Sequence, residues 1–122
     1  MTGKYRHGID AKGRLAIPAR LREELGTAFY VTIGLEHSLM VLTETGFDSI
    51  VEKMRSLPMA QAQQLRFFFA NAQRCEPDKQ GRILLPQELR NYAHLTENAV
   101  ILGFGDKAEI SWDAVFFGPD RK

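Results

Sequence analysis

A thirteen-residue stretch occurs twice in this chain, and the repetition constrains the fold more than any other feature. Residues 10–22 read Asp-Ala-Lys-Gly-Arg-Leu-Ala-Ile-Pro-Ala-Arg-Leu-Arg, and residues 78–90 read Asp-Lys-Gln-Gly-Arg-Ile-Leu-Leu-Pro-Gln-Glu-Leu-Arg. An internal repeat of this quality indicates one structural unit used twice. Because 122 residues with 44% hydrophobic content suit a single core, we expect two equivalent halves within one compact α+β unit.

Each copy of the repeat lies within the same predicted succession of elements. In the first half, the residue pattern predicts strands over residues 4–9 and 15–17, a helix over residues 18–25, and a hairpin with strands over residues 29–33 and 39–42. The second half is predicted to follow the first: a strand over residues 73–76 leads into the repeated motif with its second short strand. A helix over residues 86–93 and a hairpin with strands over residues 99–104 and 108–112 come next. Each half is therefore predicted as β-β-α-β-β.

A helical insert is predicted between the halves. Apolar residues at helical spacing run from Phe47 to Leu57, and Pro58 ends that helix. A second helix is predicted over residues 59–69. Its three consecutive phenylalanines are too dense for one helix face, so we expect part of this segment to contact another subunit or the opposite half. The expected organisation is a first repeat with its following helix over residues 1–57, a helical connector over residues 58–72 and a second repeat over residues 73–122.

The composition argues against several classes of protein. A single cysteine, Cys75, excludes an internal disulfide framework, and the histidines have no zinc-site spacing to it. The sequence has no N-terminal apolar segment and no run of about 18 apolar residues that would predict export or a membrane span. We therefore expect a cytoplasmic protein without a metal, a cofactor or a membrane partner.

The net charge is only +1, but the charges are segregated along the chain. Residues 1–22 contain six basic residues and one acidic residue, whereas residues 23–57 contain six acidic and two basic residues. Such segregation is compatible with a basic face that binds a polyanion.

Local turn and helix-start chemistry explains part of the repeated motif. A tight turn between two strands needs a residue with positive φ, and an aspartate at its start accepts hydrogen bonds from backbone N–H groups two residues on. A proline favours the first turn of a helix. This structural interpretation covers six of the repeated residues, namely Asp10, Gly13, Pro18, Asp78, Gly81 and Pro86.

The turn does not require the two arginines, Arg14 and Arg82. A guanidinium is a planar fork of donors that matches phosphate and the O6/N7 edge of guanine. The neighbouring aspartate can hold this fork in one orientation or accept a hydrogen bond from cytosine N4. An Asp–Arg ion pair that only locks the loop is the structural alternative, and the two roles are compatible.

Further basic residues surround both motifs and are expected to contact phosphates, which gives affinity without sequence information. They are Lys4, Arg6, Lys12, Arg20, Arg22, Arg74, Lys79 and Arg90. Neither Asp-x-x-Gly-Arg segment contains an aromatic residue, so duplex DNA is favoured over a stacked single strand.

Two enzymatic readings fail on detail. Paired aspartates in pseudo-symmetric halves suggest an aspartic-protease dyad, but those sites follow the acid with a small hydroxyl residue and glycine. Here residues 11–12 and 79–80 are Ala-Lys and Lys-Gln, and an arginine would keep each acid ionised. A phosphate-binding loop is also excluded, because the glycines are isolated and no Gly-Lys-Ser/Thr sequence occurs. We expect no enzymatic activity.

The two motifs and the insert between them resemble the MraZ family of bacterial transcriptional regulators. The similarity covers almost the whole chain and is closest over residues 7–14, 17–20, 66–72 and 75–82. It implies a pseudo-symmetric, double-repeat, swapped-hairpin AbrB-like β-barrel with short helices and a helical linker. In such a fold the two halves pair within one chain. The resemblance also implies a ring-shaped homo-oligomer.

The resemblance implies a function as well. In that family the aspartate and the arginine of each motif contact DNA, which corresponds here to Asp10, Arg14, Asp78 and Arg82. The DNA is a short G-rich element repeated in tandem in the promoter of the division and cell-wall gene cluster. The usual output is repression of that cluster, including the regulator's own gene. We therefore expect a nucleoid-associated repressor.

Three features depart from the family pattern. Pro77 stands before Asp78 where a residue with an N–H group is usual, so we expect the second hairpin to lose a ladder hydrogen bond. The second copy is less basic, so Arg14 is expected to contribute more to DNA binding than Arg82. Residues 115–119 stand where the family commonly has a longer polar helical tail.

Two other functions remain as alternatives. One is the DNA-binding antitoxin of a toxin–antitoxin pair, although such antitoxins usually carry one repeat and a disordered toxin-binding tail. The other is a structural assembly protein, which would bind no DNA at physiological salt.

Overall fold

Both halves of the molecule contain the same succession of elements. The computed structural model describes residues 1–112. The first half contains β1 (Lys4–Gly8), β2 (Arg14–Ala16), α1 (Ala19–Leu25), β3 (Phe29–Ile33) and β4 (Leu39–Thr43). The second half contains β5 (Gln73–Cys75), β6 (Arg82–Leu84), α5 (Gln87–Tyr92), β7 (Asn98–Phe104) and β8 (Lys107–Ser111). The predicted order is confirmed, with small differences at the ends. The end of the predicted second repeat, including residues 115–119, lies outside the described residues.

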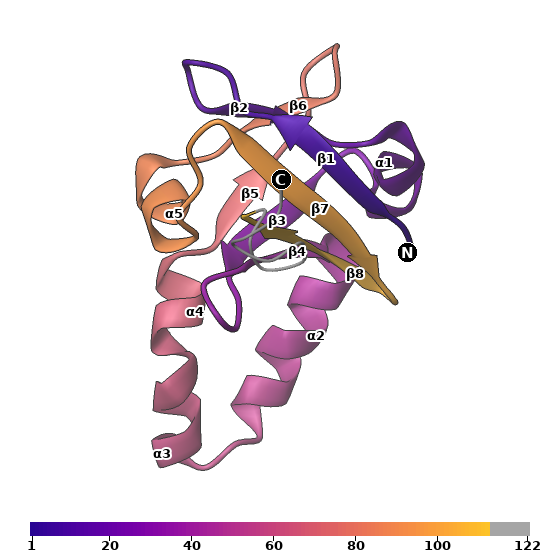
Figure 1. Ribbon diagram of the computed structural model, residues 1–122. Coiled ribbons are helices and arrows are strands. Elements are labelled where there is room, and N and C mark those ends of the chain that lie inside the picture. The colour runs from indigo at the N-terminus through magenta and orange to yellow at the C-terminus, as the bar shows by residue number, and fades with distance from the viewer. Residues whose placement is uncertain (113–122) are drawn as a thin grey trace.

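The two halves exchange strands (Figure 1). A six-stranded sheet has the order β1-β7-β8-β4-β3-β5, and a two-stranded ribbon pairs β2 with β6. The first strand of each half therefore pairs with the other half: His7 of β1 lies opposite Ala99 of β7, and Cys75 of β5 lies opposite Phe29 of β3. This is the swapped-hairpin arrangement that the resemblance implies, so the predicted α+β fold class is confirmed.

One cluster of buried side chains draws on both halves. Leu15 of β2 and Ile83 of β6 lie opposite each other in the ribbon, and they are 0% and 3% exposed. Leu21 of α1 and Leu89 of α5 are buried in the same cluster. Helices as short as these are unstable in isolation, so the buried leucines hold α1 and α5 in place.

A helical arm, residues 44–70, joins the halves and projects away from the sheet (Figure 1). It starts with α2 (Glu44–Arg55), where the Thr43 hydroxyl accepts a hydrogen bond from Gly46 N at 2.9 Å and so caps the helix. The return segment consists of α3 (Met59–Ala62), the 3₁₀ turn η1 (Gln63–Leu65) and α4 (Arg66–Ala70). The prediction of one helix over residues 59–69 is therefore wrong. A 3₁₀ turn has fewer residues per turn than an α-helix, so it shifts the phase of the apolar positions that follow it.

The three consecutive phenylalanines of α4 lie in different environments. Phe68 and Phe69 pack against Phe47 of α2, with ring centroids 6.4 and 5.7 Å away, and Phe47 stacks on Tyr30 of β3 at 3.9 Å. Phe67 is 62% exposed. The expectation that part of this segment contacts another subunit or the opposite half stays a prediction.

Candidate nucleic-acid interface

The first repeated motif forms a tight hairpin loop between β1 and β2. Gly13 N donates to Asp10 O at 2.9 Å, and Asp10 N donates to Arg14 O at 3.0 Å. The Asp10 Oδ1 atom accepts the backbone N–H groups of Lys12 at 3.0 Å and Arg14 at 2.9 Å. The Oδ2 atom accepts the Arg14 Nε–H at 2.7 Å. One carboxylate thus closes the turn and orients the guanidinium.

The second motif reproduces this geometry between β5 and β6. Gly81 N donates to Asp78 O at 2.9 Å, and Asp78 Oδ1 accepts the backbone N–H groups of Gln80 and Arg82, each at 2.9 Å. The Arg82 Nε–H donates to Asp78 Oδ2 at 3.0 Å. The predicted turn chemistry and the Asp–Arg ion pair are therefore present in both copies. The Nε–H is one of the five N–H donors of a guanidinium.

Both loop glycines are required by backbone conformation and by close packing. Gly13 has φ 88° and Gly81 has φ 77°, a region that other residues rarely adopt. A Cβ atom at Gly13 would lie 2.8 Å from Cζ of Arg90, and a Cβ atom at Gly81 would lie 2.6 Å from Cζ of Arg22. Each glycine therefore lies under an arginine from the helix of the other half.

Carbonyl groups hold these two arginines in place. Arg22 of α1 donates from Nε to Ile17 O at 2.9 Å, and Arg90 of α5 donates from Nε to Leu85 O at 2.9 Å. From the sequence, both side chains are expected to contact phosphates. The structure gives them a structural role: each connects its helix to the opposite loop. The only sequence signal for this role was their matching position in the two copies.

The two loops project from the same end of the molecule, one on each side of the β2–β6 ribbon (Figure 1). Ile17 N donates to Gly81 O, and Leu85 N donates to Gly13 O, each at 2.9 Å. Arg82 Nη1 also lies 3.9 Å from Asp10 Oδ2, across the boundary between the loops. The fold thus brings Asp10, Arg14, Asp78 and Arg82 into one cluster, although the two motifs are far apart in sequence.

The loop environment keeps both aspartates ionised. The backbone N–H of Arg14 is the main cause that lowers the pKa of Asp10 from 3.8 to about 2, and the Arg14 side chain adds to it. The backbone N–H of Arg82 is likewise the main cause of the lowered pKa of Asp78. Desolvation acts in the opposite direction at both sites and is outweighed. Each Asp–Arg pair is therefore a fixed pair of opposite charges at neutral pH.

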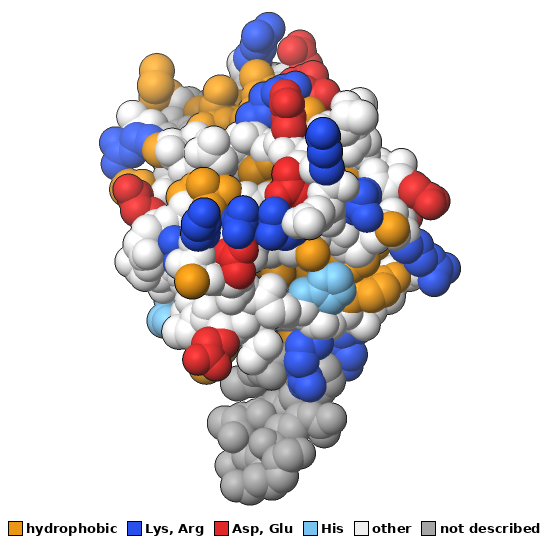
Figure 2. All heavy atoms as spheres, turned by 90° about the horizontal axis from the view of Figure 1, so that it is seen from above, with side chains coloured by type: hydrophobic (Ala, Val, Ile, Leu, Met, Phe, Trp, Pro, Cys, Tyr) orange, Lys and Arg blue, Asp and Glu red, His pale blue; other side chains and the backbone are white. Residues whose placement is uncertain are grey.

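Most of the other predicted contact residues are exposed. Lys12 and Lys79 are exposed in the two turns, Lys4 and Arg6 are exposed on β1, and Arg20 is exposed on α1. Figure 2 views this end of the molecule directly and shows basic side chains across its middle with acidic side chains among them.

Arg74, another predicted phosphate contact, already has acidic partners. Its Nε atom lies 3.2 Å from Glu44 Oε2, and its Nη1 atom lies 2.5 Å from Glu76 Oε2. These ion pairs connect β5 to the start of the helical arm. Arg74 and Arg22 are thus bonded to groups of the protein itself. Lys12 and Lys79, in contrast, are exposed in the turns.

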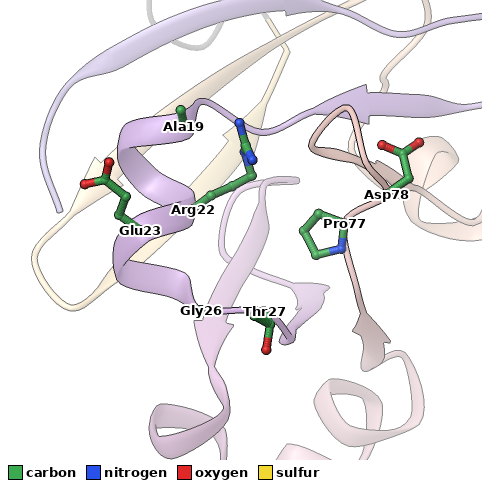
Figure 3. Close-up of a pocket in the computed structure, with 7 residues that line it drawn as sticks. All are labelled: Ala19, Arg22, Glu23, Gly26, Thr27, Pro77 and Asp78. Carbon is green, nitrogen blue, oxygen red and sulfur yellow. The ribbon is translucent and has the colours of Figure 1, made fainter.

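Pro77 makes the base of the second loop different from that of the first. Ile9, the matching residue of the first copy, donates its N–H to Glu97 O at 2.8 Å, a bond that a proline cannot make. Accordingly β5 ends at Cys75, and a cleft of about 540 Å³ lies between α1 and the segment with Pro77 and Asp78 (Figure 3). The expected loss of a ladder bond is confirmed.

Residues 1–112 give little support for a reactive thiol, a metal site or a membrane span. Burial raises the pKa of the Cys75 thiol to about 11, so it is not a reactive thiolate. The described part of the chain holds no group of three or more His, Cys, Asp or Glu residues that could bind a metal. No helix within it is both long enough and apolar enough to span a bilayer.

The fold and the paired loops define a class of protein: a duplicated swapped-hairpin, AbrB-like fold that presents two Asp–Arg loops from a single chain. The sequence model of the family described as "MraZ protein, putative antitoxin-like" matches residues 1–67 and 68–117. The chain belongs to this MraZ family.

Several curated relatives are similar along most of their length. The chain is 50% identical over 111 residues to the transcriptional regulator MraZ of Carboxydothermus hydrogenoformans, a match that covers 88% of this chain and 78% of the relative. It is 50% identical over 123 residues to that of Desulfitobacterium hafniense strain Y51, which covers 98% and 86%. It is 42% identical over 119 residues to that of Halothermothrix orenii, which covers 95% and 82%. These names denote regulators and no enzyme.

Proposed function

We propose that this protein is a sequence-specific DNA-binding transcriptional regulator. The observation that carries the proposal is the cluster of two Asp–Arg pairs, in which Asp10 Oδ2 lies 2.7 Å from Arg14 and 3.9 Å from Arg82. Two guanidinium groups held at fixed positions on one exposed end can read two guanines, each through O6 and N7. The names of the relatives support this assignment.

The shape of the site favours duplex DNA. The two-stranded ribbon β2–β6 carries both arginines, and the major groove of B-DNA admits a two-stranded β-ribbon. We propose that the exposed basic side chains contact the phosphates; they are Lys12 and Lys79 in the loops, together with Lys4, Arg6 and Arg20. We propose these phosphate contacts as the source of affinity and the Asp–Arg pairs as the source of specificity.

We further propose the biological setting that the family resemblance implies. The DNA is a promoter with tandem, short, G-rich repeats upstream of the division and cell-wall gene cluster, and the protein represses that cluster and its own gene. The protein then acts in the cytoplasm at the nucleoid as a ring-shaped homo-oligomer. Met59 and Phe67 on the helical arm are 76% and 62% exposed, and such apolar side chains support a contact between protomers.

Fluorescence anisotropy with duplex DNA from upstream of the protein's own gene tests the DNA-binding proposal. Arg14→Ala is expected to weaken binding by about 1–3 kcal/mol. The slope of log K against log salt concentration is expected to fall by about one at most, which corresponds to one phosphate contact. Arg82→Ala is expected to weaken it less. Arg55→Ala on α2, which removes the same charge from an exposed site in the arm, serves as the matched control.

The outcomes separate three interpretations. Salt-sensitive binding that only the loop substitutions weaken, with a scrambled duplex bound poorly, supports the proposal. Equal binding by all variants would mean that the Asp–Arg pairs only hold the loop conformation and do not contact DNA. Absence of binding at physiological salt contradicts the proposal and favours a structural assembly protein.

An antitoxin role is the second candidate, and the family description, which includes the term antitoxin-like, is the observation that favours it. An antitoxin would also bind DNA, so the anisotropy experiment does not distinguish the two. The distinguishing result is growth arrest on expression of a neighbouring gene that this protein relieves.

A further inference from the structure

The outward face of the β2–β6 ribbon is not symmetric. Arg14 lies opposite Leu84, Leu15 opposite Ile83, and Ala16 opposite Arg82. Successive strand residues point to opposite faces, and the central pair is buried. The outward face therefore carries Arg14 beside Leu84 at one side and Arg82 beside Ala16 at the other.

Leu84 is the residue that breaks the symmetry. Its side chain is 59% exposed, whereas the remaining leucine and isoleucine of the ribbon are 0% and 3% exposed. A large apolar side chain directly across from an arginine of the proposed reading site is thus presented on the same face. The matching residue in the other copy, Ala16, ends at Cβ and cannot reach as far.

We propose that Leu84 is a specificity-determining residue that contacts the C5-methyl group of a thymine next to the guanine read by Arg14. The proposal rests on the DNA-binding function proposed above. The thymine methyl is the apolar group that base edges present in the major groove, and apolar side chains read it by contact. Directly opposed residues in a sheet have Cβ atoms about 5 Å apart, so Arg14 and Leu84 can reach neighbouring base pairs.

With Leu84 on one side only, the two sides of the DNA-reading face make different contacts, so the face has a direction. Arg82 has the short Ala16 opposite it, so its guanine has no matching methyl contact. One protomer then reads a non-palindromic element although its fold is pseudo-symmetric. Directional reading lets every protomer of an assembly bind tandem repeats in the same orientation.

The test uses a duplex enriched by the wild-type protein from a pool of random DNA. Each thymine of that duplex is replaced in turn by deoxyuridine, which removes only the methyl group, and binding is measured by anisotropy. Wild type is expected to lose about fourfold in affinity at one thymine beside a guanine, as expected for one buried methyl group. Leu84→Ala introduces the alanine that stands at the matching position of the other half. This variant is expected to bind the thymine duplex and its deoxyuridine counterpart with equal affinity.

Ala16→Leu provides the reverse test. It is expected to create a new thymine preference at the other side of the element, because it places a leucine beside Arg82 as well. Both substitutions lie on the exposed face, so thermal unfolding midpoints close to that of wild type confirm that the variants fold.

Each contrary outcome is distinct. If wild type enriches no duplex, the DNA-binding function itself fails, and this inference with it. If wild type enriches a duplex but thymine-to-deoxyuridine replacement affects Leu84→Ala as much as wild type, only the role of Leu84 is overturned. A changed assembly size of Leu84→Ala would also overturn it, since the side chain would then belong to a contact between copies.

Discussion

At the scale of single residues, the Asp10 carboxylate both closes the first loop and orients Arg14. It accepts three hydrogen bonds, two from backbone N–H groups and one from Arg14. All three favour the ionised form, and the pKa of Asp10 falls to about 2. The loop conformation and the orientation of Arg14 therefore depend on one negative charge.

A pH series tests this dependence. A folded-state pKa below the ordinary 3.8 stabilises the native state above that value, and the stabilisation is lost as the pH falls towards 2. Asp10→Asn is therefore expected to be less stable than wild type at pH 5–7, with the difference disappearing near pH 2. Thermal unfolding from pH 2 to 7 measures it, and Asp48→Asn on α2 is the control. A difference that does not change with pH would contradict the assignment.

The residues of this site were predictable to different degrees. The roles of Asp10 and Gly13 follow from sequence because the turn is local: the carboxylate bonds to N–H groups two and four residues on. The packing of Arg90 over Gly13 could not be predicted, because it joins segments from opposite halves. Leu84 had no sequence signal either, since an aliphatic residue in a strand is normally buried.

At the scale of elements, the helices of one half support the loops of the other. Arg22 of α1 packs over Gly81, and Arg90 of α5 packs over Gly13. Each guanidinium also binds a carbonyl of the segment that enters its own helix. The position of each loop thus depends on a helix from the opposite half.

Substitution of these arginines should therefore have crossed effects. Arg90→Ala is expected to increase amide hydrogen exchange in the first loop, at Lys12 and Gly13, and Arg22→Ala in the second, at Gln80 and Gly81. Each should cost about 1.5–3 kcal/mol of stability, the usual contribution of a hydrogen bond to a charged group. Arg20→Ala, its exposed neighbour on α1, is the control. Faster exchange confined to the loop of the same half would contradict the crossed support.

Element types were largely predictable, whereas element partners were not. The β7–β8 hairpin follows from two apolar runs around Gly105. The pairing of β1 with β7 has no local signature, and only the family resemblance implied it. The interruption at η1 was missed because no proline or glycine marks it, and tertiary packing of Phe68 and Phe69 on Phe47 accompanies it.

At the scale of the whole molecule, the proposed reading site is small. It offers two Asp–Arg pairs and a few phosphate contacts, which suits weak binding by one protomer. In the proposed ring, several such sites on one particle can occupy tandem repeats, and each further site binds at a high effective concentration. Affinity would then depend on the number of repeats.

Removal of one repeat from a multi-repeat duplex tests this multivalency. Affinity is expected to fall by far more than the loss of one base contact, because a whole linked binding event disappears. Binding is compared on duplexes of equal length in which one repeat is intact or scrambled. A loss no larger than about 1–3 kcal/mol, the contribution of a single contact, would argue against the ring acting as a multivalent unit.

The exchange of strands between the halves has a consequence for synthesis of the protein. β1 is among the first elements to leave the ribosome, yet its partner β7 begins only at Asn98. The first loop also needs Arg90, so it cannot take its final form until most of the message has been translated. A prematurely terminated chain without α5 and β7 would lack both Arg90, which packs over Gly13 of the first loop, and the strand that pairs with β1. Only a chain translated through both repeats can present the complete pair of loops.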